Sequence, residues 1–404
     1  MTQRKWTTTR RGFLAGAAGL VVQQGVSAIT RHRTRGANNR IQIGLIGCGY
    51  RGGQLLDNLH SLETSGADVT IDAVCDAHEP RRRHSAKRYR ATEVRRWEDL
   101  VTRSEIDAVI IATPDHSHAP MAIAALQAGK DVYCEAPLGL RLEEAAQVCR
   151  MARETDRVFQ LGIEECSQAQ WHAARGQVQK GVLGKLRWSQ AVDQRNARGI
   201  AAPPALHSNV DSHNLDWDAF LGTAPKHRFD GDRFLHWKDY GTYSRGVAAA
   251  SQLHLLAPLL IALGPETPES VTAMGGNFTH APSHAPDTLI STIRYPSGHS
   301  VVLHTSTANT NHHAPIIRGE DAAIELQGQS LRVTDERIGH ANPPSRVVEV
   351  PEARPSHFED WLNCLRTRAT CTCPPSLAYK TQVAVHMALD ACRRQSTVSA
   401  HALA

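Results

Sequence analysis

The sequence predicts an α/β protein with two domains, the first of which is built on a parallel sheet. Its 404 residues exceed what one ordinary hydrophobic core supports. Between residues 41 and 135, short apolar runs alternate with helical patterns at the spacing of a parallel sheet with crossover helices. Farther along, residues 289–295 and 301–303 flank a Pro-Ser-Gly turn, which predicts a β-hairpin in the second domain.

Basic residues gather at the N-terminus. Residues 1–40 carry eight Lys and Arg side chains and no acid, which exceeds the net charge of +5 of the whole chain. The remainder is therefore slightly acidic and shows no sign of the basic face that nucleic-acid binding requires. We expect no nucleic-acid partner and interpret the basic start as a sorting signal.

Residues 9–14 form a twin-arginine pattern, followed by an apolar stretch over 13–22 and by small residues at 26–28. This arrangement is typical of a cleaved twin-arginine signal peptide. The apolar stretch is shorter than the roughly twenty residues that span a bilayer, so an uncleaved membrane anchor is the weaker interpretation. We predict a signal peptide over 1–28, a polar linker over 29–39, and export to the periplasm or the extracellular space of a bacterium.

The folded part begins with a strand pattern at 41–46, which is followed at once by Gly47, Gly49 and Gly52 and then by a helical pattern. Gly47 permits a tight turn, Gly49 lets a diphosphate approach the backbone, and Gly52 lets the helix pack on the strand. The N-terminus of the helix offers free N–H groups and a partial positive charge to phosphates. This unit predicts a Rossmann domain that binds a dinucleotide.

A second strand pattern, residues 69–75, ends in Asp76. Asp76 occupies the place of the acid that accepts hydrogen bonds from both ribose hydroxyls. Its charge would repel a 2′-phosphate, which favours NAD over NADP. Arg81, Arg82 and Arg83 could instead pair with such a phosphate, but a solvated helix face is the preferred interpretation.

A third strand at 108–112 closes in residues 113–118, a helix follows over 119–128, and a fourth strand at 131–134 ends in Glu135. Ligands of parallel α/β sheets bind outside the carboxyl ends of the strands, so residues at these ends are candidates for contact. The predicted cofactor-binding residues are Gly47, Gly49, Tyr50, Arg51, Gly52, Asp76, Thr113, Pro114, His118 and Glu135.

These motifs resemble those of the Gfo/Idh/MocA oxidoreductases. The resemblance extends over roughly residues 40–395 and rests on residues 112–118, 128–135, 157–162, 181–186, 215–217, His254 and 357–368. It implies a Rossmann domain over 40–160, a C-terminal α/β domain with a large, mostly antiparallel sheet over 161–350, and C-terminal helices over 351–404. It also implies hydride transfer between NAD(P) and a sugar or polyol.

Three positions depart from the family pattern. Strand four usually ends in Glu-Lys-Pro, whose Lys holds the reacting hydroxyl, but Ala136 stands here. A helix motif that is usually Asp-x-Gly-x-His-x-x-Asp retains only His254, with Ala250 and Ala257 in place of the acids. His254 can act as a general base, but we expect it to lack the carboxylates that would orient it. The third departure is residues 162–167, where related chains often carry Gln-Gln-Arg-Ser.

General acid–base help is typically worth about a hundred- to ten-thousandfold in rate, so these losses should cripple simple dehydrogenation unless other residues substitute. We name His254 and, with less support, Tyr243 as catalytic candidates; other residues of the same stretch are Tyr240, Lys238 and His213. Three functions stay open: sugar or polyol dehydrogenation, non-catalytic binding or sensing of a sugar with NAD bound, and oxidation-assisted elimination. The last is the chemistry of the family's NAD-dependent glycosidase branch, which also lacks that Lys.

The nine cysteines and twenty-two histidines indicate no metal site at a recognised ligand spacing. Most cysteines read as small core residues, and a disulfide such as Cys371 with Cys364 is an open alternative. The histidine groups His280 with His284 and His312 with His313 lack further ligands. A sheet of the predicted size commonly supports a homodimer, and we expect no membrane span after removal of the leader.

Overall fold

A computed structural model of the chain describes residues 40–196, 209–279, 285–311, 313–337, 344–350 and 354–400. The predicted leader and linker lie outside the described residues, as do His280, His284 and His312.

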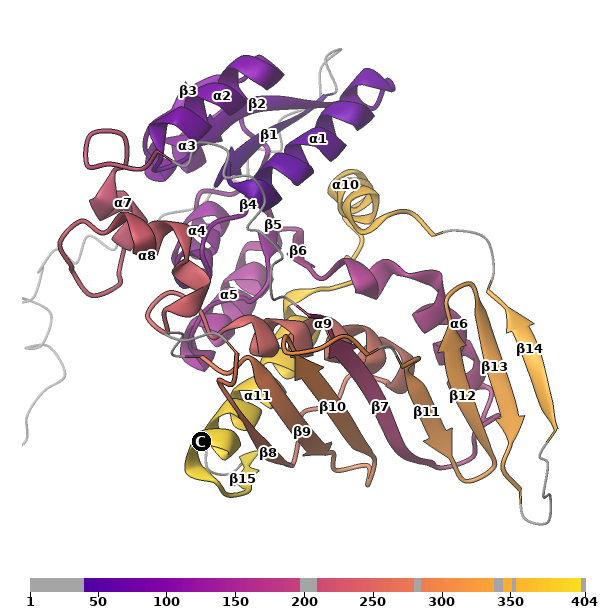
Figure 1. Ribbon diagram of the computed structural model, residues 1–404. Helices are drawn as coiled ribbons and strands as arrows, with labels where there is room; N and C mark the ends of the chain where they lie inside the picture. Colours follow the sequence, from indigo (N-terminus) through magenta and orange to yellow (C-terminus); the bar gives the residue numbers. More distant parts are fainter. Residues whose placement is uncertain are drawn as a thin grey trace, which may run out of the picture. The chain divides into compact units, whose positions relative to one another are not determined.

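The N-terminal half contains a six-stranded sheet in the order β3-β2-β1-β4-β5-β6, and every neighbouring pair is parallel (Figure 1). The strands are β1 (Ile41–Ile46), β2 (Val69–Cys75), β3 (Thr92–Val94), β4 (Ala108–Ile111), β5 (Asp131–Glu135) and β6 (Phe159–Gly162). The strand order reverses between β1 and β4, which is where ligands of such sheets bind. The predicted Rossmann domain is confirmed.

The helices of this half are α1 (Tyr50–Thr64), α2 (Glu79–Tyr89), α3 (Trp97–Thr102), α4 (Asp115–Gln127) and α5 (Leu142–Thr155). Strand β3, a short strand with two exposed residues, was not predicted. Helix α4 begins at Asp115, four residues before the predicted start at Ala119. The Asp-His-Ser-His turn has low intrinsic helix propensity, but it is buried, and the Ser244 hydroxyl donates to Asp115, so tertiary contacts override that propensity.

Both faces of the parallel sheet are covered. On one face, Ile43 and Leu45 of β1 pack with Leu59 of α1 and with Trp361, which comes from the C-terminal helix α10 (His357–Thr367). On the other face, apolar residues of α3, α4 and α5 join the main core. The C-terminal part of the chain therefore contributes to the core of the nucleotide-binding sheet.

The second sheet has nine strands in the order β14-β13-β12-β11-β7-β10-β9-β8-β15. The pair β7 and β10 is parallel, and all others are antiparallel, as the resemblance implied. The predicted hairpin is confirmed as β9 and β10. The strands are β7 (Leu186–Gln194), β8 (Ser270–Gly276), β9 (Thr288–Arg294), β10 (Ser300–Ser306), β11 (Ile316–Gly319), β12 (Ala322–Gln327), β13 (Ser330–Asp335), β14 (Ser345–Glu349) and β15 (Val398–Ser399).

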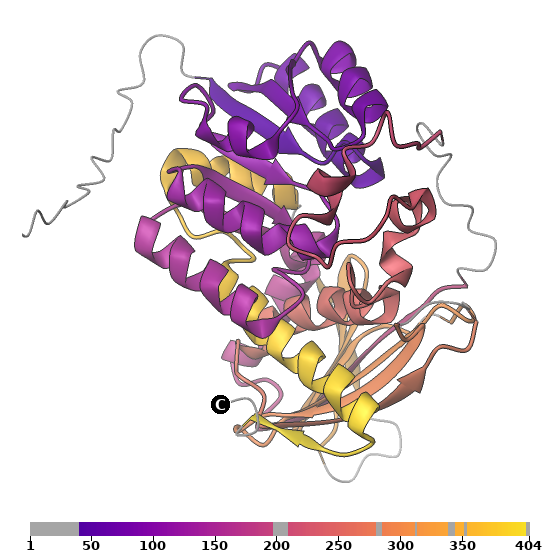
Figure 2. The same cartoon turned by 90° about the vertical axis from the view of Figure 1, so that its left-hand side faces the viewer.

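Helices α6 (Ala169–Gln179), α9 (Val247–Leu263) and α11 (Pro375–Arg394) contact this sheet. Helix α9 is apolar almost all around and largely buried, as expected for a helix between two layers. Helix α11 also contacts α5, and Figure 2 shows it in yellow between the Rossmann half and the sheet. The shorter helices are η1 (Glu164–Ser167), α7 (Trp217–Leu221), α8 (Gly231–Leu235) and η2 (Trp237–Asp239).

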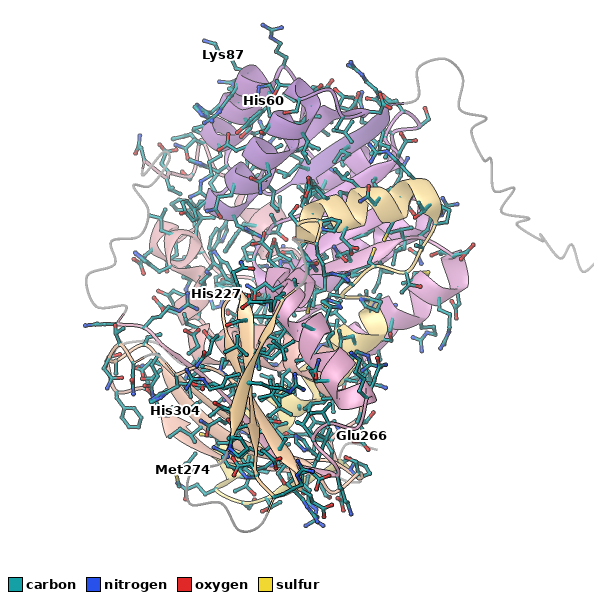
Figure 3. All side chains as sticks on the ribbon, turned by 90° about the vertical axis from the view of Figure 1, so that its right-hand side faces the viewer. His60, Lys87, His227, Glu266, Met274 and His304 are labelled. Atoms are coloured by element: carbon teal, nitrogen blue, oxygen red, sulfur yellow. The ribbon has the colours of Figure 1, made fainter. Side chains whose placement is uncertain are left out.

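The sheet face opposite these helices carries Met274 of β8, which is 71% exposed, and His304 of β10 (Figure 3). The expected homodimer stays a prediction. Among the described residues, no helix combines the length and the apolar composition needed to cross a membrane.

Candidate functional site

The turn between β1 and α1 depends on glycines that tolerate close backbone contacts. Gly47 has φ +97°, and a Cβ there would lie 2.4 Å from the carbonyl oxygen of Ala112 after β4. A Cβ on Gly52 would lie 1.8 Å from the carbonyl oxygen of Gly47. Gly49 differs, because a Cβ there would meet only Arg81, at 3.8 Å. Gly47 and Gly52 therefore serve packing, while Gly49 leaves the backbone open to a ligand.

The N-terminus of α1 is suited to a diphosphate. Gly49 is its N-cap and supplies no capping side chain, and the first turn contains no acid. The backbone N–H groups of this turn are therefore left to a ligand or to solvent, and the helix dipole is uncompensated. Tyr50 in this turn is 65% exposed. These features fit the dinucleotide predicted from the sequence.

Asp76 joins the ends of β1 and β2. One carboxylate oxygen accepts the backbone N–H of Cys48 at 2.7 Å, and the other accepts that of His78 at 2.7 Å. A carboxylate has about four acceptor positions, so Asp76 can still accept ribose hydroxyls. The same bonds fix the carboxylate beside the glycine turn, as the sequence placed it.

The three arginines of α2 have different environments. Arg83 is exposed and pairs with Glu79, as expected of a solvated helix face. That expectation is wrong for Arg82, which is 7% exposed and donates to the carbonyl oxygen of Asp76. Arg81 lies beside Gly49, with its guanidinium 4.7 Å from the centroid of the Phe234 ring. Among the three, Arg81 is the one placed near the phosphate-binding turn.

The segment after β4 is held in place by side-chain contacts within the segment and with the residues after β5. Pro114 is the N-cap of α4, and the Thr113 hydroxyl faces the sulfur of Met121 at 3.8 Å. The buried His118 ring lies 2.8 Å from the carbonyl oxygen of Thr113 and 2.7 Å from that of Pro137. His118 therefore ties the end of β4 to the end of β5.

Arg51 links the glycine turn to the ends of β5 and β6. Its guanidinium lies 2.8 Å from Glu135 and 2.5 Å from Glu164. Burial raises the pKa of Glu135, although the charge of Arg51 opposes that rise. A Cβ on Gly162 would lie 2.8 Å from Glu135, so the glycine makes room for this carboxylate. The charged cluster is thus built around the first turn of α1.

Next to this cluster, Glu165 of η1 bonds His254 of α9. Oε2 of Glu165 lies 2.8 Å from Nδ1 of His254, and the two side chains are 39% and 34% exposed. Burial alone would lower the pKa of His254, but the bond to Glu165 and the charges of Glu165 and Glu135 raise it overall. Burial would raise the pKa of Glu165, but His254 lowers it overall. This arrangement favours an imidazolium–carboxylate pair.

The expectation that His254 lacks an orienting carboxylate is therefore wrong. Ala250 is half-buried and Ala257 is fully buried on α9. Each carries only a methyl group, so neither can take the role of the missing acids. The carboxylate comes instead from Glu165, within the third departure from the family pattern. Ala136 lies against the apolar core at the end of β5.

The contacts of the other catalytic candidates are with neighbouring side chains of the fold. Tyr243 is fully buried among aromatic rings, with ring centroids 5.1 Å from His116 and 5.2 Å from Phe220. The Tyr240 hydroxyl donates to Asp232 at 2.9 Å, and Lys238 lies over the ring of Trp237. His213 is exposed.

Sequence reasoning missed Glu165 and Glu164 as functional residues. It recorded the Glu-Glu pair only as a departure, because the partners Arg51 and His254 are 113 and 89 residues away in the chain. One signal was available in the sequence. Glu164 and Glu165 follow the end of β6, in a chain that lacks the family's Lys and its two Asp residues.

Two family models match the chain: the Gfo/Idh/MocA oxidoreductase family, NAD-binding Rossmann fold, over residues 41–163, and the C-terminal alpha/beta domain of that family over residues 221–399. The chain belongs to the Gfo/Idh/MocA oxidoreductase family. Its Rossmann half is an NAD-binding domain, and the glycine turn with Asp76 fits that cofactor.

Curated relatives of this chain carry names that refer to carbohydrates. A glycosyl hydrolase family 109 protein of Stenotrophomonas maltophilia is 31% identical over 230 residues, which are 54% of this chain and 48% of that protein. A 2,7-anhydro-N-acetylneuraminate hydratase of Escherichia coli is 26% identical over 305 residues, 72% of this chain and 70% of that protein. The alignment with the first of these relatives thus spans about half of its length.

Several solved structures share the fold of this chain. Levoglucosan dehydrogenase in complex with NADH and levoglucosan has a TM-score of 0.71 at 16% identity, with 89% of this chain and 99% of that chain covered. An oxidoreductase domain protein from Kribbella flavida has a TM-score of 0.71 at 17% identity, with 89% and 99% covered. The fold of these two structures is therefore shared over 89% of this chain.

Replacing Asp76 by Ala should weaken NAD binding by about 10- to 100-fold, because a hydrogen bond to a charged group contributes about 1.5–3 kcal/mol. Calorimetry with NAD measures the effect, and Arg83→Ala is the matched control, since Arg83 pairs with Glu79 on the surface of α2. The same NAD affinity in folded Asp76→Ala and in the parent would contradict the assignment of Asp76 to the ribose.

Replacing Glu165 by Gln should lower the pKa of His254, because the charge that overcomes burial is lost. NMR titration of the ring measures this, with the signal assigned by comparison with His254→Gln. Glu164→Gln is the matched control, since Glu164 bonds Arg51 rather than His254. Equal shifts in both variants would rule out a specific Glu165–His254 pair.

The sign of the stability effect follows from the same pKa shifts. The raised pKa of His254 contributes stability that is complete below its ordinary value of 6.5 and is lost as pH rises through the folded-state pKa. The lowered pKa of Glu165 contributes stability above its ordinary value of 4.5 that is lost as pH falls. The pair is therefore most stabilising between these two limits.

Proposed function

We propose that this protein is an NAD-dependent enzyme that acts on a sugar or a glycoside. The observation that carries the proposal is the Glu165–His254 hydrogen bond beside Arg51 and Glu135. It supplies an oriented acid–base group at the carboxyl ends of the strands, where the family's Lys is replaced by Ala136. The carbohydrate-directed names of the curated relatives support the choice of substrate class.

When bound, NAD supplies an acceptor for a hydride from a sugar carbon. The protein must then move protons. Nδ1 of His254 is engaged by Glu165, so proton transfer falls to Nε2. In its neutral form, His254 takes a proton from the substrate, which restores the imidazolium–carboxylate pair with Glu165 that the surroundings favour. Arg51 and Glu135 fix the first turn of α1 relative to this pair.

Within this proposal, oxidation-assisted elimination is favoured over simple dehydrogenation. NAD, when bound, would first accept a hydride as a ring hydroxyl becomes a carbonyl, which acidifies the neighbouring C–H. His254 would then remove that proton while the C–O bond to the glycosidic group breaks and the leaving oxygen takes up a proton. Water would add across the resulting C=C bond, and return of the hydride to the carbonyl would leave no net NADH. The relatives named for glycosyl hydrolase and hydratase activities support it, since both names describe making or breaking a C–O bond.

A non-catalytic, NAD-bound sugar sensor is the second candidate. The observation that favours it is the set of alanines at 136, 250 and 257, which leaves the family's usual Lys and Asp positions without proton-transferring groups. The two candidates predict different roles for His254. The enzyme needs His254 to convert the sugar, whereas the sensor needs only the folded protein to bind it.

Turnover of glycosides discriminates these functions. We expect the NAD-loaded protein to cleave at least one member of a p-nitrophenyl glycoside panel without net NADH formation, measured by absorbance of nitrophenol and of NADH. His254→Ala should reduce the rate by about a hundredfold or more, and Glu165→Gln by less.

The other outcomes are distinct. Net NADH formation with a sugar would show simple dehydrogenation. Heat of sugar binding without any chemical change would support the sensor. In that case, the combined variant Ala136→Lys and Ala250→Asp tests whether the protein is a degraded dehydrogenase. If sugar dehydrogenation then appears, the rest of the cleft has remained intact.

We also propose that the protein is exported by the twin-arginine route, supported by the sequence pattern over residues 9–14 and by the small residues at 26–28, which suit signal-peptide cleavage. That route carries folded proteins, which suits a protein that binds a cytoplasmic cofactor. Fractionation of bacteria should find the mature chain outside the cytoplasm. Arg10→Lys with Arg11→Lys should retain it inside, and export of that variant would argue against the route.

A further inference from the structure

Helix α10 packs on one face of the nucleotide-binding sheet. Phe358 and Trp361 are buried there, and their rings pack at centroid distances of 5.5 Å from Tyr133 of β5. At the end of the helix, Arg368 donates two bonds to Asp131 at the start of β5. The helix is thus attached to the sheet at both of its ends and along its length.

The segment after α10 returns to the same sheet. Leu161 of β6 donates its backbone N–H to the carbonyl oxygen of Cys373, and Cys373 donates to the side chain of Gln160. At the other end of α10, His357 bonds both Leu161 and Ser167. The helix and this segment therefore hold β6 and η1, the elements that lead to Glu165.

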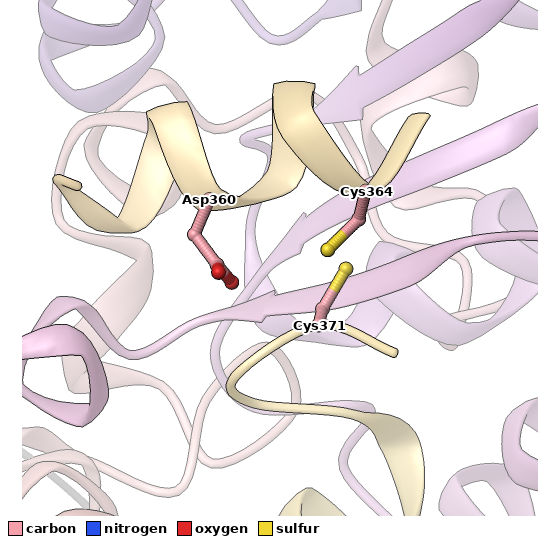
Figure 4. A group of neighbouring side chains, drawn as sticks. All are labelled: Asp360, Cys364 and Cys371. Atoms are coloured by element: carbon pink, nitrogen blue, oxygen red, sulfur yellow. The ribbon is translucent and has the colours of Figure 1, made fainter. Parts of the chain in front are cut away.

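Where the helix and the segment meet, three side chains converge. Cys364 of α10, Cys371 of the segment and Asp360 of α10 have their ligating atoms within 4.8 Å of one another, and Figure 4 shows the two sulfurs pointing toward each other. Both cysteines are nearly buried, at 4% and 5% exposure. The backbone N–H of Thr372 donates to Asp360 at 2.9 Å.

We propose that Cys364 and Cys371 form a disulfide that clips the end of α10 to the segment bonded to β6. The alternative occupant of this cluster is a metal ion. A structural zinc site takes four N or S ligands, whereas this cluster offers two thiols and one carboxylate, which already accepts a backbone N–H. Two facing thiols in a short loop satisfy each other without a further ligand.

The oxidation is a thiol–disulfide exchange with a donor disulfide such as oxidised glutathione. One cysteine thiolate attacks the donor and releases one thiol; the second cysteine thiolate then displaces the other half of the donor. The two cysteines lose two electrons and two protons, and the donor becomes two thiols. The predicted export would place the chain where such bonds persist.

The clip does not depend on the proposed activity. It would limit fraying of α10 from the Rossmann sheet and hold β6 in place ahead of η1. A loop of this length is expected to contribute a modest entropic stabilisation.

Alkylation of the full chain provides the test. After equilibration with a mixture of oxidised and reduced glutathione, denaturation and labelling with N-ethylmaleimide, we expect intact mass to show seven labels on the nine cysteines. Prior reduction should give nine. Reduction should also lower the Tm by about 2–4 °C. Cys364→Ser and Cys371→Ser should each label at all eight remaining cysteines.

Cys373→Ser is the matched control, because it lies two residues from Cys371 and should keep the cross-link, with six labels. Nine labels on the oxidised parent chain would overturn the proposal. So would a cross-link that Cys373→Ser abolishes, or one zinc ion per chain by elemental analysis that Cys364→Ser removes. Labelling reads the parent chain directly, so the test holds even where a serine variant fails to fold.

Discussion

The close backbone contact at the β1–α1 turn is the constraint on which the site depends. Because Gly47 and Gly52 carry no Cβ, the turn packs against the end of β4 and against itself at distances that no side chain allows. This fixes where α1 begins. The first turn of α1 in turn determines the position of Arg51, through which the nucleotide-binding loop connects to the other strand ends.

Arg51 is the first member of a series of neighbouring charged side chains in the site. Arg51 pairs with Glu135 and Glu164, and the next residue, Glu165, holds His254. Glu135, Glu164 and Glu165 share a partly buried region with the guanidinium of Arg51, and the charges of Glu165 and Glu135 stabilise a protonated His254 there. In the proposed mechanism, the oriented His254 at the strand ends takes over the proton transfer for which this chain lacks the family's Lys and Asp groups.

Local patterns predicted much of the Rossmann half, since glycine spacing and apolar runs act through short-range sterics. They failed where long-range contacts decided the outcome. The first turn of α4 is helical because Asp115 and its neighbours are buried, although its residues are weak helix formers. Arg82 is internal because the Asp76 carbonyl and Glu93 satisfy it. Glu165 was left unassigned because nothing near it in the chain indicates a histidine partner.

The sequence by itself determined the dinucleotide turn, the acid at Asp76, the parallel sheet and the absence of the usual Lys and Asp, because each is a matter of residue type at short spacing. The tertiary structure decided which acid serves His254, which arginine lies beside the phosphate turn, and which cysteines face each other. Those outcomes require elements far apart in the chain to pack together. The side chains then meet through the geometry of the layers rather than through their order in the sequence.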